Sequence, residues 1–252
     1  MSEKLILITN DDGVHADGLK ALQKALLSLG RVVVVAPHHE MSGTSHALTT
    51  SIPVRIKEIE KDFYSVSGYP ADCVYAAMHG LLKKKPDLTV SGINKGANMG
   101  VDVYYSGTVA GIRQSVMDGT PGFAMSLVID TYKDNFHWQD AADYAKTVAQ
   151  KMLAKGYKKN GFLNINYPNI PKQEVKGVKI TTTGDRRYAQ EVKWGKDPRG
   201  KDYCWLWGDY SCFTPTQNTD CTVVNDGYIS VTPIALDVTD HKMMDELKDW
   251  NL

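Results

Sequence analysis

The feature that most constrains this chain is an unbroken aliphatic run near its N-terminus, which ends in polar residues. Residues 5–8 read Leu-Ile-Leu-Ile, and Asn10, Asp11, Asp12 and Gly13 follow after one threonine. Large aliphatic residues without polar alternation are typical of a strand that is covered on both faces, as in a parallel sheet. We therefore expect a buried strand that carries its polar residues to a crevice at its carboxyl end.

Asp11 and Asp12 are adjacent carboxylates, whereas successive side chains of an extended strand point to opposite faces. They converge on one point only if the chain has already left the strand, which Gly13 makes easy. Two carboxylates held together repel each other, and a bound cation relieves this repulsion. The alternative is an ordinary polar turn in which one aspartate caps the next helix. From this stretch alone both interpretations stay open.

Apolar strands and amphipathic helices alternate along the first 171 residues. Leu19, Leu22, Leu26 and Leu29 follow helical spacing, and Gly30 ends that helix. Further strands are expected at residues 32–35, 87–91, 123–129 and 162–168, a strand-rich excursion at about 47–67, and helices from Asp72, after Thr108 and from Asp140. This order predicts an α/β fold with a Rossmann-like, doubly wound, mostly parallel sheet, in which residues 162–168 form the last core strand.

The character of the chain changes at about residue 172, where helical periodicity gives way to β-rich pieces and turns. We expect residues 1–171 to form a Rossmann-like catalytic core and residues 172–252 a β-rich C-terminal extension that serves in oligomer formation. Aromatic residues gather in this extension: Trp194, Tyr203, Trp205, Trp207 and Tyr210. They either form an oligomer contact or close the core of the same chain, and the sequence favours neither.

Charge and cysteine content exclude several classes of protein. The 29 basic and 29 acidic residues give a formal charge of zero, which argues against a nucleic-acid duplex or a membrane surface as partner. The four cysteines show no Cys-x-x-Cys pair, so we expect reduced thiols. No segment reaches the length of a membrane span or of a signal-peptide core, and we expect a cytoplasmic protein.

Oxygen ligands follow three of the expected strands. Asp11 and Asp12 follow the first strand, Ser42 lies in the loop after the second, and Asn94 follows the third. Open α/β sheets bind ligands at the carboxyl ends of strands, where the strand order reverses. Carboxylate, hydroxyl and amide oxygens suit magnesium or manganese better than zinc. The nearby histidines lack a helical His-x-x-x-His spacing and are less favoured as ligands: His15, His38, His39 and His46.

A second polar stretch, Ser106-Gly107-Thr108, lies where a helix is expected to start. Its unpaired amides and the positive end of the helix dipole can receive a phosphate, and glycine lets the backbone approach closely. Asn98, four residues after Asn94, is placed to donate to the same anion. The alternative is that Ser106 or Thr108 is simply the N-cap. The sequence motifs of P-loop NTPases, dinucleotide-binding proteins and serine hydrolases are absent.

Six motifs follow one another along the chain: Ile8–Gly13, Ala36-Pro37 with Ser42-Gly43, Ser91–Asn98, Tyr105–Ala110, Asn164–Pro168 and Gly227–Pro233. Together they resemble the SurE family of stationary-phase survival nucleotidases. The resemblance spans nearly the whole chain and is weakest from about residue 184 to residue 220. It implies a Rossmann-like phosphatase whose C-terminal extension is used in homodimers or homotetramers.

The resemblance also implies a reaction, a cofactor and a set of site residues. The reaction is that of a 5′-nucleotidase, the hydrolysis of nucleoside 5′-monophosphates, and of 3′-monophosphates, to nucleoside and phosphate. Short polyphosphate is a further candidate substrate. One divalent metal ion per subunit, Mg²⁺ or Mn²⁺, would be held by Asp11, Asp12, Ser42 and Asn94. Phosphate would be bound by Asn98, Ser106, Gly107 and Thr108.

Catalysis is expected to combine in-line attack by water with a proton acceptor, for which Asp11 and Asp12 are the candidates. An aspartyl-phosphate intermediate is left open. A non-catalytic nucleotide-sensing protein is the alternative function, and a nicotinamide oxidoreductase is a third that the missing Gly-x-Gly-x-x-Gly weakens.

Overall fold

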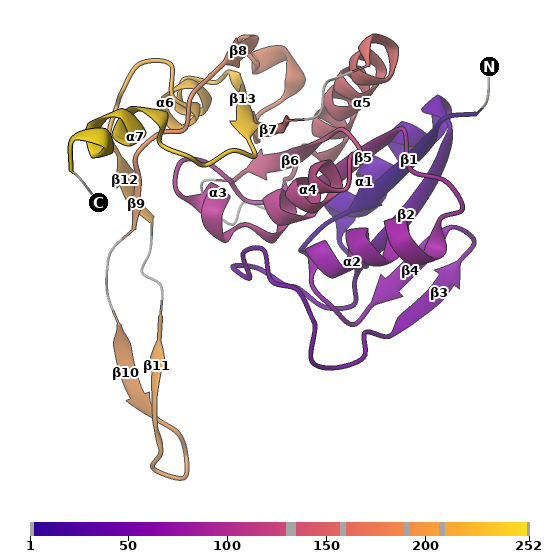
Figure 1. Ribbon diagram of the computed structural model, residues 1–252, viewed down its shortest axis with the longest axis horizontal. Coiled ribbons are helices and arrows are strands. Elements are labelled where there is room, and N and C mark those ends of the chain that lie inside the picture. Colours follow the sequence, from indigo (N-terminus) through magenta and orange to yellow (C-terminus); the bar gives the residue numbers. More distant parts are fainter. Residues whose placement is uncertain (1–2, 130–134, 157–159, 189–191, 207–209, 251–252) are drawn as a thin grey trace.

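The computed structural model describes residues 3–129, 135–156, 160–188, 192–206 and 210–250, without the side chains of residues 210–212 (Figure 1). Its strands are β1 (Leu5–Thr9), β2 (Arg31–Pro37), β3 (Ile56–Glu60), β4 (Phe63–Val66), β5 (Leu88–Lys95), β6 (Gly122–Val128), β7 (Gly161–Pro168), β8 (Val178–Ile180), β9 (Arg186–Tyr188), β10 (Lys193–Lys196), β11 (Asp202–Trp205), β12 (Tyr210–Phe213) and β13 (Ile229–Ala235). Its α-helices are α1 (Asp17–Leu26), α2 (Pro70–Ala76), α3 (Asp102–Tyr105), α4 (Gly107–Met117), α5 (Trp138–Lys155), α6 (Asp220–Asn225) and α7 (His241–Leu247). Short 3-10 or π turns follow at residues 27–29, 77–81, 172–174 and 248–250.

The centre of the molecule is a nine-stranded sheet with the order β3-β4-β2-β1-β5-β6-β7-β13-β8. The run from β4 to β7 is parallel throughout, while β3 and β13 pair antiparallel with β4 and β7. The predicted α/β class and the mostly parallel, doubly wound sheet are confirmed. The strand order reverses between β1 and β5, because the chain moves from β1 toward β2 but from β5 toward β6. Open sheets bind ligands at this kind of switch point.

Strand β1 is buried along its whole length, as its aliphatic sequence predicts. Ile6 and Ile8 face the layer of α1 and α5, where Leu19 and Leu22 belong to the same cluster. On the opposite face Leu5 and Leu7 pack with residues of α2, and α4 extends that layer. Figure 1 shows these helices on both sides of the sheet. Gly30 was the predicted end of the first helix. Helix α1 ends at Leu26, and a 3-10 turn at Leu27–Leu29 continues the chain to Gly30.

The sheet contains more of the chain than expected. The prediction that residues 162–168 form the last core strand is wrong, because β13 pairs with β7 along six residues and β8 pairs with β13. Both strands come from residues 172–252, so the segment predicted as an extension also completes the sheet. The division at residue 171 stays a prediction. In the excursion at about 47–67, strands form only at β3 and β4.

Two short antiparallel ribbons lie outside the main sheet, β9 with β12 and β10 with β11. Figure 1 shows the β10–β11 ribbon standing away from the body of the molecule. Trp194 is 74% exposed and Trp205 is 69% exposed, so the alternative in which these two rings close the core of this chain is wrong. Trp207 and the ring of Tyr210 lie outside the described residues. No helix in the described ranges is long and apolar enough to span a membrane.

Candidate active site

The residues that follow β1 and the end of β5 meet at the switch point of the sheet. Thr9 and Ser91 form the last pair between β1 and β5. Asp11 and Asn94 both follow this pair, although Asn94 still pairs with Ser126 of β6. The expectation that the third strand ends at Ser91 is wrong, since β5 continues to Lys95 with an irregularity between Gly92 and Asn94. Gly92 has a φ of 136°, and a Cβ there would lie 2.2 Å from the Met125 carbonyl oxygen. Only glycine fits this bend.

Asp11 is 3% exposed and connects three segments of the chain. Its carboxylate Oδ1 accepts a hydrogen bond from the Thr108 hydroxyl at the start of α4. Its backbone carbonyl accepts one from the Met41 amide at 2.7 Å. A Cβ added to Gly107 would lie 2.8 Å from the Asp11 Cβ, so the glycine lets the helix terminus approach the carboxylate. The structure thus brings Asp11 together with two of the predicted phosphate-binding residues.

Asp12 is held from the other side, because its Oδ2 accepts a hydrogen bond from the Lys95 backbone amide at 2.9 Å. Burial, reinforced by the negative charge of Asp11, raises the pKa of Asp12 to about 7. Burial also raises the pKa of Asp11, although the bond from Thr108 opposes the shift. No Lys, Arg or His of the described residues forms an ion pair with either carboxylate. The repulsion between them therefore suits a bound cation.

The loop after β2 runs beside Asp11 and carries Ser42. The exposed Ser42 hydroxyl donates to the Glu40 Oε1 at 2.9 Å. This bond uses the proton of the hydroxyl and leaves oxygen lone pairs for a cation. Glu40 is not among the predicted site residues, yet its negative charge also raises the pKa of both Asp11 and Asp12. The one signal for Glu40 in the sequence is its position two residues before the predicted ligand Ser42.

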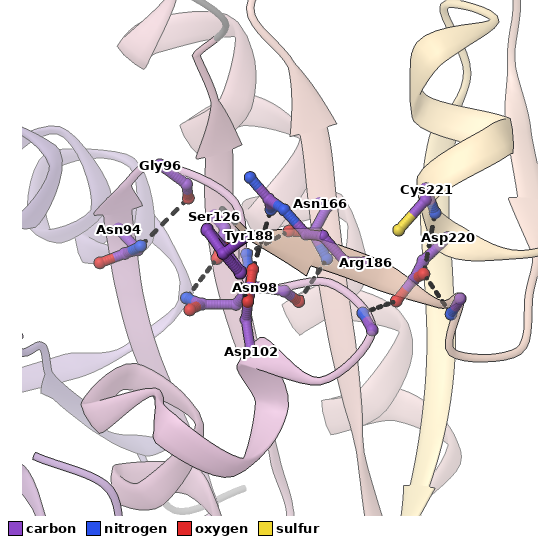
Figure 2. A network of polar contacts seen from close by, with 12 residues as sticks. Asn94, Gly96, Asn98, Asp102, Ser126, Asn166, Arg186, Tyr188, Asp220 and Cys221 are labelled. Atoms are coloured by element: carbon purple, nitrogen blue, oxygen red, sulfur yellow. Dashed lines mark hydrogen bonds and ion pairs between the residues drawn. The ribbon is translucent and has the colours of Figure 1, made fainter. Parts of the chain in front are cut away.

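Asn94 and Asn98 lie differently although both belong to the asparagine-rich segment (Figure 2). The Asn94 side-chain nitrogen donates to the Gly96 carbonyl at 3.0 Å, which turns the amide oxygen away from Gly96. The Asn98 side-chain nitrogen instead donates to the Ser126 hydroxyl at 2.9 Å, and the residue is 6% exposed. Asn98 is therefore engaged within the protein, and its role toward phosphate stays a prediction.

Two asparagines of β7 hold the backbone of Asn98. The Asn98 amide donates to the Asn166 Oδ1 at 2.9 Å, and the Asn98 carbonyl accepts from Asn164 and Asn166 at 2.7 Å and 3.1 Å. Neither asparagine is among the predicted site residues, although both belong to the motif Asn164–Pro168. Polar residues at alternate positions of a buried strand were the signal for this role.

Residues from the C-terminal part of the chain fix the next stretch (Figure 2). The Asp220 carboxylate accepts from the Gly100 amide at 2.9 Å and from the Gly184 amide at 2.8 Å. The buried Asp102 pairs with Arg186 at 2.9 Å and accepts from the Tyr188 hydroxyl at 2.7 Å. Burial raises the pKa of Asp102, and the guanidinium of Arg186 opposes this shift. No local pattern in the sequence reveals these contacts.

At the start of α4, Ser106 is the N-cap, since its hydroxyl accepts from the Val109 amide at 3.1 Å. Ser106 therefore caps the helix, and its role toward phosphate stays a prediction, whereas the Thr108 hydroxyl binds Asp11. Capping one amide leaves the other first-turn amides, those of Gly107 and Thr108, without a partner inside the helix. The Thr108 amide is directed to the Asp11 carboxylate. The Gly107 amide and the positive end of the dipole of this 11-residue helix therefore face an anion that binds beside Asp11.

The donor set fits a hard cation better than a zinc ion. Among the described residues, no group of three His, Cys, Asp or Glu side chains is arranged to hold a metal. A metal at Asp11 and Asp12 would depend on neutral oxygens for its other protein ligands, as magnesium and manganese do. Two of the histidines have other partners, because His38 contacts Ser65 and His46 contacts Gln114, each at 3.0 Å.

Comparison with known proteins identifies relatives along nearly the whole chain. The family model of the survival protein SurE matches residues 6–190. The 5′-nucleotidase SurE of Syntrophotalea carbinolica is 43% identical over 248 residues, 98% of this chain and 98% of that protein. The 5′-nucleotidase SurE of Aquifex aeolicus is 41% identical over 244 residues, 96% of each chain. The crystal structure of the SurE protein from Aquifex aeolicus has a TM-score of 0.85 at 40% identity and covers 98% of this chain and 100% of that chain. The chain therefore belongs to the SurE family.

Proposed function

We propose that this protein is a divalent-metal-dependent phosphatase that hydrolyses nucleoside 5′-monophosphates, and 3′-monophosphates, to nucleoside and phosphate. The observation that carries the proposal is the contact between the paired aspartates and the start of α4, through Thr108 and Gly107. This contact places a candidate cation site, the two aspartates, directly beside a candidate anion site, the start of α4, because one hydrogen bond links Thr108 to Asp11. The relatives named 5′-nucleotidase SurE support the same substrate class.

One metal ion per subunit, Mg²⁺ or Mn²⁺, would be held by Asp11, Asp12, Ser42 and Asn94. When bound, it would withdraw charge from the phosphoryl oxygens and lower the pKa of water. The protein orients these ligands through Thr108 on Asp11, the Lys95 amide on Asp12, and Glu40 on Ser42. Such outer partners fix the ligands of metal sites in proteins.

The phosphoryl group would lie against the start of α4, where Ser106, Gly107 and Thr108 would bind it and the helix dipole would neutralise its charge. Asn98 would act either by donating directly or by fixing the backbone of its segment, since its amide is bonded to Ser126. Asp11 or Asp12 would take the proton from the attacking water. A carboxylate nucleophile is the alternative that this arrangement leaves open.

The test is phosphate release from a panel of nucleoside 5′- and 3′-monophosphates and short polyphosphate, with Mg²⁺, with Mn²⁺ and with a chelator. We expect release with a divalent metal, none with the chelator, and a loss of at least about 100-fold in Asp12→Asn. Near-normal turnover of Asp12→Asn with manganese would remove Asp12 from the site. Stoichiometric nucleotide binding without release in any metal would instead favour the nucleotide-sensing alternative.

We also propose that the protein forms a homo-oligomer and that it is located in the cytoplasm. The exposed tryptophans of the β10–β11 ribbon support a homodimer or homotetramer that uses residues 172–252. We place the protein in the cytoplasm, with nucleoside monophosphates as its small-molecule partners and neither a membrane nor a nucleic-acid duplex among them. The balanced charge supports this placement.

A further inference from the structure

The loop that carries Ser42 needs support, because this predicted metal ligand differs from the other three. Asp11 and Asp12 closely follow β1 and Asn94 belongs to β5, whereas Ser42 lies in an exposed loop beyond the end of β2. A neutral hydroxyl on an irregular segment contributes to metal binding only when the segment is already held in place, since ordering a free loop opposes binding. The contacts that hold this loop therefore bear on the metal site.

One end of the loop is fixed next to Ser42 itself. The Met41 amide donates to the Asp11 carbonyl at 2.7 Å, and the Thr44 hydroxyl donates to the Met41 carbonyl at 2.8 Å. The second bond closes a turn across Ser42 and Gly43, whose φ of 70° suits glycine. Ser42 thus lies in a closed turn that begins beside Asp11.

The other end of the loop is fixed by Ser45 to the end of α3. Its backbone amide donates to the Tyr105 carbonyl at 2.8 Å, and its hydroxyl donates to the Tyr104 carbonyl at 2.6 Å. Ser45 has a φ of 54°, a conformation that residues other than glycine rarely adopt and that persists where surrounding contacts require it. Ser106, the N-cap of α4 and a predicted phosphate-binding residue, follows Tyr105 directly.

His46 adds a contact between the same loop and α4. Its Nε2 lies 3.0 Å from the Oε1 of Gln114, a residue that is 5% exposed. The Gln114 side-chain nitrogen donates to the Asp118 Oδ2 at 3.0 Å, so the Gln114 oxygen is the acceptor and His46 carries its proton on Nε2. Asp118 in turn contacts His79 at 3.2 Å. The acceptor for His46 is therefore a buried side chain that is itself held in place.

We propose that Ser45 and His46 are positioning residues for the metal ligand Ser42, because together they connect its loop to the helices that form the phosphate site. We call these two residues the latch. The inference rests on the metal site of the proposed function and adds two residues that act through Ser42. The latch makes the Ser42 turn and the start of α4 one unit, since the carbonyls that Ser45 binds immediately precede Ser106.

The test is a double-mutant cycle measured by calorimetric titration with Mn²⁺. Ser45→Ala/His46→Phe, the latch variant, removes both side-chain donors and keeps the bond from the residue 45 amide, so the fold is retained. We expect its Mn²⁺ affinity to fall about tenfold relative to wild-type protein. In a Ser42→Ala background the same two substitutions should change the affinity less than about twofold, because the ligand that they position is already absent.

Two control variants separate positioning from a general effect on the fold. His46→Gln keeps an N–H donor for Gln114 and should bind Mn²⁺ with wild-type affinity. His79→Phe removes the contact to Asp118 at the far end of the same chain of contacts and should also leave the affinity unchanged. With adenosine 5′-monophosphate as substrate, saturating Mn²⁺ should return kcat of the latch variant to the wild-type value, because the latch acts on metal occupancy.

Wild-type Mn²⁺ affinity in the latch variant would overturn the inference, as would an equal loss of affinity with and without the Ser42 hydroxyl. A kcat that stays low at saturating Mn²⁺, or an equal loss of affinity in His79→Phe, would also overturn it. Failure of wild-type protein to bind Mn²⁺ would refute the latch together with the metal site. Mn²⁺ binding that follows these expectations, without phosphate release from any nucleotide, would instead refute only the proposed phosphatase.

Discussion

Asp11 and Asp12 are neighbours in the sequence, yet the fold gives them different surroundings. Asp11 is fixed by a side chain from α4, and Asp12 by a backbone amide at the end of β5. Because a separate hydrogen bond fixes each carboxylate, the two carboxylates remain close despite their repulsion. The donors of these bonds lie far along the chain, so the sequence predicted that the aspartates converge but not what holds them.

The first prediction concerns the pH dependence of stability in metal-free protein. The pKa of Asp12 rises from 3.8 to about 7 on folding, so between these values the folded state keeps a proton that the unfolded state has released. The stabilising contribution of this group is therefore present below about pH 4 and is lost as the pH rises through about 7. We expect the Tm of chelator-treated wild-type protein to fall relative to Asp12→Asn over this range. A constant Tm difference would contradict the raised pKa.

The second prediction concerns Thr108, whose hydroxyl binds Asp11. Thr108→Val keeps the shape of the side chain and removes the donor, so we expect manganese affinity to fall about 10- to 100-fold. Thr108→Ser keeps the hydroxyl and serves as the control, with affinity close to that of wild-type protein. Calorimetric titration with Mn²⁺ measures both variants. Equal affinity of the valine and serine variants would show that the hydroxyl does not position Asp11.

At the scale of elements, the segment from Gly96 to Thr108 runs from the end of β5 into α4 and carries all four predicted phosphate-binding residues. Strand β7 holds its beginning through two asparagines, while β9 and the start of α6 hold its middle through Arg186 and Asp220. Two of these three supports come from residues 172–252. The C-terminal part of the chain is thereby coupled to the site in the same molecule.

The third prediction tests this support. The side chains of Arg186 and Asp102 are 14% and 9% exposed, and removing one partner of a buried ion pair leaves the other charge uncompensated. We expect Arg186→Met to lower the free energy of unfolding by about 3 kcal/mol. The matched control is Arg187→Met, whose pair with Asp185 is 63% and 48% exposed and should cost less than about 1 kcal/mol. Urea unfolding measures the free energy of unfolding of both variants. Equal losses would show that the buried pair stabilises the fold no more than the exposed pair does.

At the scale of the whole molecule, the body and the β10–β11 ribbon differ in how they bury apolar surface. The body covers both faces of its sheet with helices, whereas the ribbon is a two-stranded sheet with exposed aromatic rings. Trp194 pairs with Cys204, and Trp205 with Lys193, so the two indoles point to opposite faces of the ribbon. An isolated ribbon of this kind is marginal in water, which is why we expect a partner subunit to cover it.

The fourth prediction follows from that expectation. Trp194→Ser/Trp205→Ser should reduce the mass measured by sedimentation to that of a smaller assembly, because the apolar anchors of the contact are lost. Trp250→Ser, at a position that is 65% exposed outside the ribbon, is the control and should leave the mass unchanged. An unchanged mass in the double variant would place the oligomer contact elsewhere.

The sequence by itself determined the parallel strands β1, β2, β5, β6 and β7 of the central sheet, because that information is local. Aliphatic runs such as residues 5–8 fit only a doubly covered strand, and helical spacing such as that from Leu19 to Leu29 marks the covering layer. Polar residues after those runs then had to gather at one edge of the sheet. Asp11, Asp12 and Asn94 could therefore be placed at that edge without knowledge of any contact.

Only the tertiary structure decided which groups hold that edge together. The bond from Thr108 to Asp11 joins residues 97 positions apart, and the pairing of β13 with β7 adds a strand from far along the chain to the sheet. The hydrogen bond from Asn98 to Ser126 and the ion pair of Asp102 with Arg186 also join residues that are far apart in the sequence. Periodicity reports which face of an element is buried, but not which distant side chain it meets, because that depends on how all the elements pack at once.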